Sequence, residues 1–88
     1  MFVYNITVKV DKEIVQQWLR WQKEVHIPEI MATNLFKDYK IFQLLEHSDD
    51  DSTTYVLQYI TETKENYNRY IAEYAPALER KGFRKVGK

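Results

Sequence analysis

His26 and Glu29 are the residues whose types and spacing best suit acid–base chemistry in this chain. A histidine titrates near neutral pH, so it can give or take a proton, and a nearby carboxylate could orient its ring. A second interpretation is structural. His26 would interact with the last carbonyl groups of one helix, and Glu29 would favour the start of the next. The sequence leaves both interpretations open and gives His26 and Glu29 as the candidate catalytic pair.

The candidate ligand-binding residues are four aromatic residues, Trp18, Tyr55, Tyr59 and Tyr70. Tyrosine hydroxyls can hold a polar ligand in a mostly apolar pocket, so a small organic molecule is the candidate ligand. Their spacing also matches the core-facing sides of the predicted strands and helices, which favours packing. No cofactor or metal site is expected. The chain has no cysteine, and Asp49 to Asp51 lack the spaced oxygens and distal glutamate of a calcium loop.

Hydrophobic periodicity predicts a strand and then a helix at the start of the chain. Residues 2–10 alternate between apolar and other side chains, as a half-buried strand does. Asp11 is the expected N-cap of a helix that runs to about His26. Pro28 lacks an N–H group, so we expect it to end that helix and open a short one over residues 28–33, ending near Asn34. The expected buried stripe of the first helix is Ile14, Val15, Trp18, Leu19, Gln22 and Val25.

The second half of the chain predicts two more strands and another helix. A strand is expected from residue 36 or 39 to 47, a solvated turn over 48–52 and a third strand over 53–61. Thr63 is the expected N-cap of a helix that restarts at Pro76 and runs to Lys81, with Gly82 as its C-cap. The buried face expected for this helix is Tyr67, Tyr70, Ile71, Tyr74 and Leu78.

These two halves echo each other with an offset of about 49 positions. The clearest echoes are Trp18 with Tyr67, Arg20 with Arg69, Trp21 with Tyr70 and, one position short, Pro28 with Pro76. Under this offset the second strand would recur at about residues 85–95, a range that extends past Lys88. The repeat therefore predicts a β-α-β-β-α order whose fourth strand is missing or truncated.

Composition and charge exclude several classes of protein. The 88 residues are expected to form one domain, 1–88, and 13 basic residues balance 13 acidic ones. A neutral chain offers no electrostatic surface for nucleic acid or an anionic membrane. No apolar run approaches the length of a membrane span, and the N-terminus does not have the pattern of a signal peptide. The expected compartment is the cytoplasm.

The predicted sheet is apolar on both faces, and this indicates a partner. In the second strand, Ile41 and Leu45 alternate with Phe42 and Leu44, so both faces are apolar. In the third strand, Val56 lies on the face opposite to that of Tyr55 and Tyr59. Helices from one chain cover only one face. Burying one large apolar side chain of the uncovered face contributes roughly 1.5–3 kcal/mol of favourable free energy. We therefore expect a homodimer that covers this face.

This strand and helix order on a two-sided sheet resembles the dimeric α+β barrel superfamily, in which ferredoxin-like units pair face to face. Residues 3–5, 26–33 (HIPEIMAT), 67–70 and 75–78 are similar to those of a small uncharacterised family that is common in Bacteroidetes bacteria. Members of that family typically continue into a further strand. The resemblance covers nearly the whole chain. It implies an α+β, ferredoxin-like fold with an antiparallel sheet, pairing as a dimeric barrel, with a ligand-sized pocket between sheet and helices.

Two functions follow as hypotheses. One is a protein that binds or transforms a small organic molecule, with His26 as its acid–base group. The alternative is a non-catalytic homodimeric module for binding or assembly. An RNA-recognition domain has the same element order but requires aromatic residues on the exposed face of its first and third strands. Those positions hold Val3, Asn5, Thr7, Val56, Gln58 and Ile60.

Overall fold

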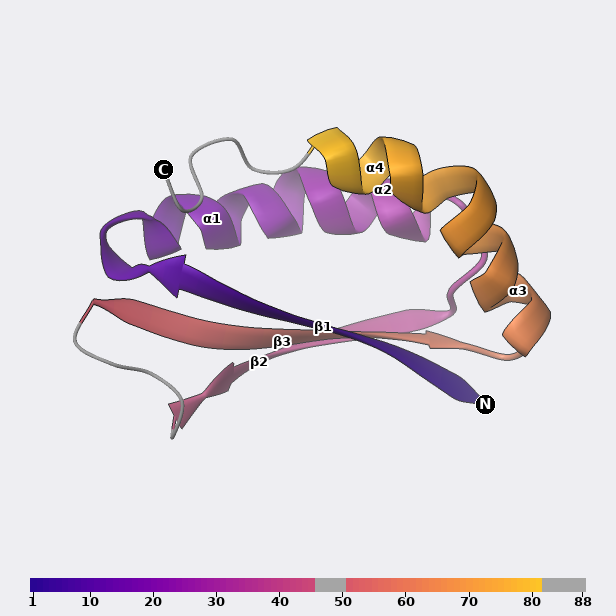
Figure 1. The fold of residues 1–88 in the computed structure, drawn as a ribbon, viewed down its shortest axis with the longest axis horizontal. Coiled ribbons are helices and arrows are strands. Elements are labelled where there is room, and N and C mark those ends of the chain that lie inside the picture. Colours follow the sequence, from indigo (N-terminus) through magenta and orange to yellow (C-terminus); the bar gives the residue numbers. More distant parts are fainter. Residues whose placement is uncertain (46–50, 82–88) are drawn as a thin grey trace.

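The computed structural model describes residues 1–45 and 51–81 and has an α+β fold, as predicted. All the helical segments lie in one layer over one face of a sheet (Figure 1). In chain order the elements are β1 (Phe2–Asp11), η1 (Lys12–Ile14), α1 (Val15–Trp21), η2 (Gln22–His26), α2 (Ile27–Met31), β2 (Asp38–Leu44), β3 (Ser52–Thr61), α3 (Lys64–Arg69), η4 (Tyr70–Tyr74) and α4 (Ala75–Lys81). Here η1 is a 3₁₀ turn, and η2 and η4 are π-helical turns.

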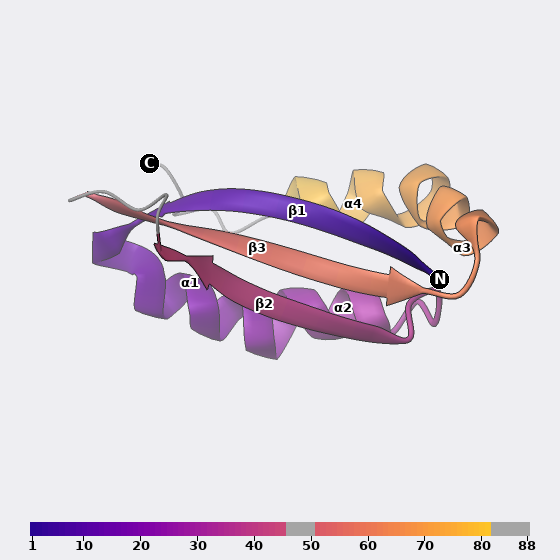
Figure 2. The ribbon, with the colours of Figure 1, turned by 90° about the horizontal axis from the view of Figure 1, so that it is seen from below.

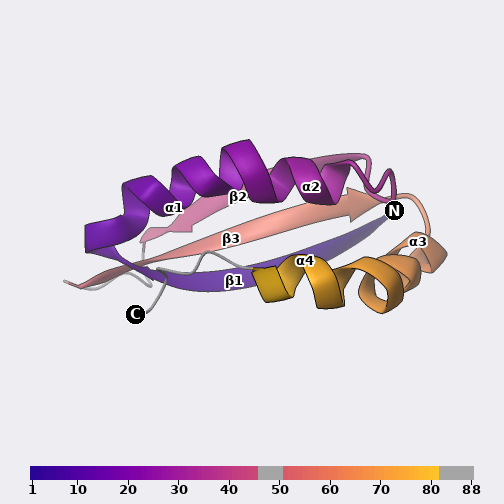
Figure 3. The same cartoon turned by 90° about the horizontal axis from the view of Figure 1, so that it is seen from above.

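The sheet has three antiparallel strands in the order β1-β3-β2, with β3 in the centre (Figure 2). The pairing of β1 with β3 runs without a bulge from Phe2 opposite Thr61 to Asp11 opposite Ser52. Above the sheet, the segment α1–α2 and the segment α3–α4 lie side by side and run in opposite directions (Figure 3). This arrangement is compatible with a ferredoxin-like fold built on a three-stranded sheet.

The strand register separates the side chains onto two faces. Tyr4, Tyr59 and Tyr39 form one row of the face beneath the helices, and Ile6, Leu57 and Ile41 form the next. The opposite face, which we call the open face, has no helix over it (Figure 1). Its rows are Val3–Ile60–Asp38, Asn5–Gln58–Lys40, Thr7–Val56–Phe42 and Lys9–Thr54–Leu44.

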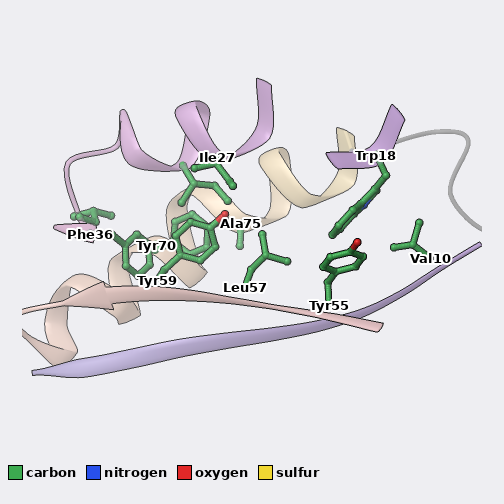
Figure 4. Close-up of a cluster of buried hydrophobic side chains, with 11 residues drawn as sticks. Val10, Trp18, Ile27, Phe36, Tyr55, Leu57, Tyr59, Tyr70 and Ala75 are labelled. Atoms are coloured by element: carbon green, nitrogen blue, oxygen red, sulfur yellow. The ribbon is translucent and has the colours of Figure 1, made fainter. Parts of the chain in front are cut away.

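The core lies between the helix layer and the sheet and is rich in aromatic rings (Figure 4). Trp18 of α1 packs against Tyr55 of β3, with ring centroids 5.2 Å apart. At the other end of the core, Phe36 contacts Tyr59 at 5.5 Å and Tyr70 at 5.1 Å. Aromatic pairs at such distances add to the free energy gained by burying their surface.

Several predicted boundaries are confirmed. Thr63 is the N-cap of α3, and its hydroxyl accepts a hydrogen bond from the Asn66 N–H at 3.1 Å. Asn34 follows the first helical segment in the left-handed conformation, with φ of 63°. The predicted turn falls largely on residues 46–50, and it lies outside the described residues, as does Gly82.

Asp11 is not the side-chain cap that we expected. It is the last residue of β1, its side chain makes no capping hydrogen bond, and the turn η1 separates it from α1. Strand β2 begins at Asp38 and ends at Leu44, so it is shorter than predicted. Phe36 precedes that strand, and its side chain is buried in the core.

The prediction that each proline breaks its helix is wrong. The backbone stays in the right-handed helical region through His26 and Ile27, and a π turn takes the place of a break. In η2, the Ile27 N–H bonds to the carbonyl of Gln22, five residues back, and in η4 Ala75 bonds to Tyr70 in the same way. Each proline comes directly after this bond. A proline ring crowds the carbonyl four residues earlier in a regular helix, and a wider turn relieves that crowding.

Each π turn also changes which side chains reach the core. A π turn adds one residue to the helix, so the buried positions after it move along by one. His26 and Ile27 are buried in place of Val25, which is 42% exposed. Ile71, which we expected on the buried face of the second helix, is 38% exposed. The regular helical spacing used for these two predictions therefore fails at η2 and η4.

Candidate functional site

His26 lies at the end of the π turn η2, and its side chain is buried, with 8% exposed. Its ring stacks on the indole of Trp21, with centroids 4.6 Å apart and planes inclined by 15°. The stacking fixes the orientation of the imidazole against the edge of the core. This ring contact is neither of the two roles predicted for His26, which are acid–base chemistry and an interaction with the last carbonyl groups of a helix.

Glu29 lies in α2, in the helical turn that follows His26, and is half-buried. Pro28 is between them, at the start of that helix. The acidic side chain in this first turn is favoured by the positive end of the peptide dipoles. The structure therefore places both candidate catalytic residues at the junction between η2 and α2.

Gln22 opens the same π turn and is 4% exposed. Among the described residues, its side-chain oxygen Oε1 has no hydrogen-bond partner. A buried acceptor without a partner costs about 1–3 kcal/mol, so such atoms are uncommon in folded proteins. The turn η2 therefore contributes two buried polar side chains, Gln22 and His26, to a mostly apolar interior.

The four predicted ligand-binding residues all lie in the core. Trp18 and Tyr55 form a pair at one end, and Tyr59 and Tyr70 belong to the cluster around Phe36 at the other (Figure 4). Tyr59 and Tyr70 have no exposed surface, and Trp18 and Tyr55 have little. The structure does not bring the four together around one site.

Three of the hollows on the surface of the described residues have none of the six predicted site residues in their lining. One, of about 460 Å³, lies on the open face beside Thr7, Lys9, Leu44 and Thr54. A second, of about 410 Å³, lies beside Asp11, Lys12, Glu13 and Asp51. The third, of about 440 Å³, is lined mainly by apolar surface beside Phe2, Val3, Tyr4, Asn5, Thr61, Lys64 and Tyr67.

This third hollow, the edge groove, runs along the first half of β1. The ring of Tyr67 in α3 stands edge-on to the ring of Tyr4, with centroids 5.3 Å apart and planes inclined by 62°. Phe2 and Val3 are 46% and 51% exposed. Lys64, in the first turn of α3, adds a positive charge to the groove.

Two acidic residues, Glu62 and Glu65, are close in sequence to Lys64, and Glu62 is paired with another residue. Glu62 forms an exposed ion pair with Lys37 that joins the end of β3 to the segment before β2. The hydrogen bond from Lys37 and its positive charge lower the pKa of the Glu62 carboxyl group from its ordinary value of 4.5. Within the described residues, no carboxylate lies within ion-pairing distance of Lys64.

Sequence reasoning did not single out the edge groove as a site. It assigned Tyr4 and Tyr67 to core packing and did not consider Lys64. A signal was present, because residues 2–8 carry no charge and Lys64 follows the N-cap Thr63. The π turns were also missed, although a proline recurs at matching places in the two halves.

Neither a metal centre nor a transmembrane helix is found in the described part of the chain. Over residues 1–45 and 51–81, no three side chains of the metal-binding types gather. No helix described there is long and apolar enough to cross a membrane.

Comparison with known proteins gives the family of the chain. The pattern of a domain of unknown function (DUF4286) matches residues 1–88, so the chain belongs to that family. No curated protein and no solved structure shows significant similarity to it.

Proposed function

We propose that this member of the DUF4286 family acts as a homodimer, joined through the open face, and serves as a non-catalytic module for binding or assembly. The observation that carries the proposal is the pattern of rows on that face. The row Thr7–Val56–Phe42 and the pair Val3–Ile60 are mainly apolar. Phe42 is 46% exposed in the single chain, so covering it and its neighbours favours association.

The polar residues between these rows suit a symmetric partner. The row Asn5–Gln58–Lys40 separates the two apolar groups. In a dimer with two-fold symmetry, every contact between the two copies occurs twice. The amide groups of Asn5 and Gln58 can therefore form hydrogen bonds across the interface. Asp38 and Lys40 carry opposite charges on the same face, so two copies can also pair them.

The size of the molecule is compatible with an interface of standard area on the open face. The molecule measures 40 by 25 Å along its two longest axes, which bounds one face at about 1,000 Å². A standard interface buries about 800 Å² on each partner. Face-to-face pairing would make the protein a dimeric α+β barrel. We also propose that this dimer acts in the cytoplasm of a bacterium.

A charge placed in the open face tests the dimer. We expect the wild-type chain to be a dimer by light scattering and sedimentation, and Phe42→Glu to be a monomer that stays folded. Val25→Glu is the matched control, because Val25 is 42% exposed on the helix layer, and it should remain a dimer. A wild-type chain that is monomeric at the highest concentration of a dilution series would overturn the proposal.

A small-molecule site at η2 is the second candidate function, and the buried Gln22 oxygen favours it. π turns inside helices are frequent at functional sites, and a bound ligand is one explanation for a buried polar atom that has no partner in the protein. In this candidate, Gln22 and His26 contact a small organic ligand, and His26 is the acid–base group beside Glu29.

The effect of His26→Ala on stability separates the two candidates. If His26 is a packing residue, its removal should lower the free energy of unfolding by about 1–3 kcal/mol and leave the dimer intact. A residue kept for function can be replaced with little loss of stability, or even a gain. Chemical denaturation of wild type and His26→Ala gives the answer, and Val25→Ala, at an exposed position, controls for the substitution itself.

A further inference from the structure

We propose that Gln58 sets the register of the open-face dimer by forming hydrogen bonds with the partner's Gln58 at the two-fold axis. The inference rests on the dimer proposed above and specifies how its two sheets lie on each other. In this arrangement the axis crosses the strands along the row Asn5–Gln58–Lys40. Each strand then faces the same strand of the partner, and the two run in opposite directions.

Gln58 has a central place on the open face. It lies in β3, the middle strand of the sheet (Figure 2), and is half-buried in the single chain. Covering the face with a second copy buries its amide group, and a buried amide needs hydrogen-bond partners. A second amide opposite to it provides them, because each amide has an oxygen that accepts and an NH₂ group that donates.

Symmetry limits how the two sheets can lie. When two copies pack through the same face, the two-fold axis lies in the plane of the interface. Aligned sheets then have two arrangements, with the axis either along β3 or across the strands. The first places β2 of one copy over β1 of the other, and the second places β2 over β2. Orthogonal packing crosses the rows of side chains, so polar rows would not meet polar rows.

The charges of β2 favour the axis across the strands. Asp38 and Lys40 are both exposed, and within the described residues neither has an ion-pair partner in its own chain. When β2 faces β2 about the row of Lys40, each ammonium group turns toward the partner's Asp38, which is one row away. Both pairs form at once, and the two ammonium groups point away from each other. With the axis along β3, no opposite charge of the partner's β1 lies in these two rows.

The apolar groups match about the same axis. A rotation about the polar row brings Ile60 over the partner's Val56, and Val3 over the partner's Thr7. A slip of one row would instead place Gln58 over an apolar residue, and its buried amide would lose its hydrogen bonds. A single buried amide fixes the register of coiled coils for the same reason. Gln58 therefore disfavours the slipped registers.

Spin labels outside the interface measure the arrangement. The chain has no cysteine, so Lys12→Cys, an exposed site in η1, carries one nitroxide per copy. From Asn5 to this site the chain spans about 23 Å, so an axis across the strands at Asn5 separates the two labels by about 45 Å. An axis along β3 keeps them less than about 30 Å apart. Pulsed electron paramagnetic resonance should give one peak near the longer distance.

Gln58→Leu in the labelled chain tests the role of the amide. The variant should remain a dimer in sedimentation, because leucine covers a similar area, but several registers should now coexist. A slip of one row changes the label separation by about 7 Å, so the peak should split or broaden by that amount. Gln43→Leu is the matched control. Gln43 is exposed on the other face of the sheet, and this variant should keep the single peak.

Reversal of charge tests the axis independently. Lys40→Glu should raise the dimer Kd by about threefold to tenfold, because it replaces two attractive pairs by repulsion. Adding Asp38→Lys to this variant should restore the Kd, since the pairs form again with their signs exchanged. No effect of Lys40→Glu, or no restoration by the second change, would contradict the axis across the strands.

The outcomes separate this inference from the dimer itself. A wild-type dimer with the short label distance would overturn the arrangement and leave the dimer standing. An unchanged distance distribution in Gln58→Leu, or loss of its dimer, would overturn the role of Gln58 in setting the register. A wild-type chain that is monomeric in sedimentation would overturn the proposed function first, and this inference with it.

Discussion

At the scale of single residues, most of the side chains that could do chemistry are used in packing. Trp18, Tyr55, Tyr59 and Tyr70 fill the space between the helices and the sheet. A small domain buries a smaller fraction of its surface than a large one. The large area buried by each aromatic side chain is therefore an important part of the free energy that stabilises the fold. Among the polar features that remain are the buried side chains of η2 and the ion pair at the end of β3.

That ion pair predicts a dependence of stability on pH. The pKa of Glu62 is lowered in the folded chain by Lys37, so its charge favours folding above the ordinary pKa of 4.5. The contribution is lost as the pH falls through the folded-state pKa. Wild type should therefore melt at a higher temperature than Glu62→Gln at pH 7, and the difference should vanish well below pH 4.5.

Calorimetry of the two proteins from pH 3 to pH 7 measures this difference. Since both side chains are exposed, the effect should be small and should shrink in 0.5 M NaCl. In a Lys37→Met background, Glu62→Gln should have no pH-dependent effect. A difference between wild type and Glu62→Gln that persists at pH 3 would show that the ion pair is not its cause.

At the scale of elements, the π turns are the least regular features of the fold and occur at matching places. Both sit in the middle of a helical segment, and each is followed by proline at the second position after it. The turn brings His26 and Ile27 into the core and leaves Val25 outside. A π turn can be treated as one residue added to a helix, and the proline is the reason that the addition is tolerated.

Deleting Val25 tests this relation between turn and proline. Removal of one residue should convert η2 into regular helix and bring the ring of Pro28 against the carbonyl four residues earlier. We expect the deletion to destabilise the protein strongly, and Pro28→Ala in the deleted chain to recover about 3 kcal/mol. Pro28→Ala alone should recover nothing. Thermal unfolding followed by circular dichroism measures all three variants, and equal effects of Pro28→Ala in both backgrounds would contradict the relation.

At the scale of the whole molecule, one layer of helices covers one face of the sheet and leaves the open face without a helix over it. The open face is wide and has alternating apolar and polar rows, which suits a copy of the same chain. The edge groove beside the first half of β1 is lined mainly by apolar surface.

The sequence by itself determined the order of the elements and the faces of the strands. Alternation is a local property, so the patterns of residues 2–10 and 53–61 predicted β1 and β3. The same alternation correctly placed Val56 and Tyr55 on opposite faces of the sheet. Thr63 and Asn34 were also predicted, because capping depends on residues within one turn. Local chemistry was enough for each of these features.

Only the tertiary structure decided which residues lie together. The change of buried face at η2 and η4 depends on how each helix packs against the sheet. Regular helical spacing therefore could not predict that Val25 and Ile71 are exposed. The edge groove joins Phe2 to Lys64 and Tyr67, which are more than sixty positions away in the sequence. Contacts over such distances follow from strand order and helix packing, and no periodicity within one segment contains that information.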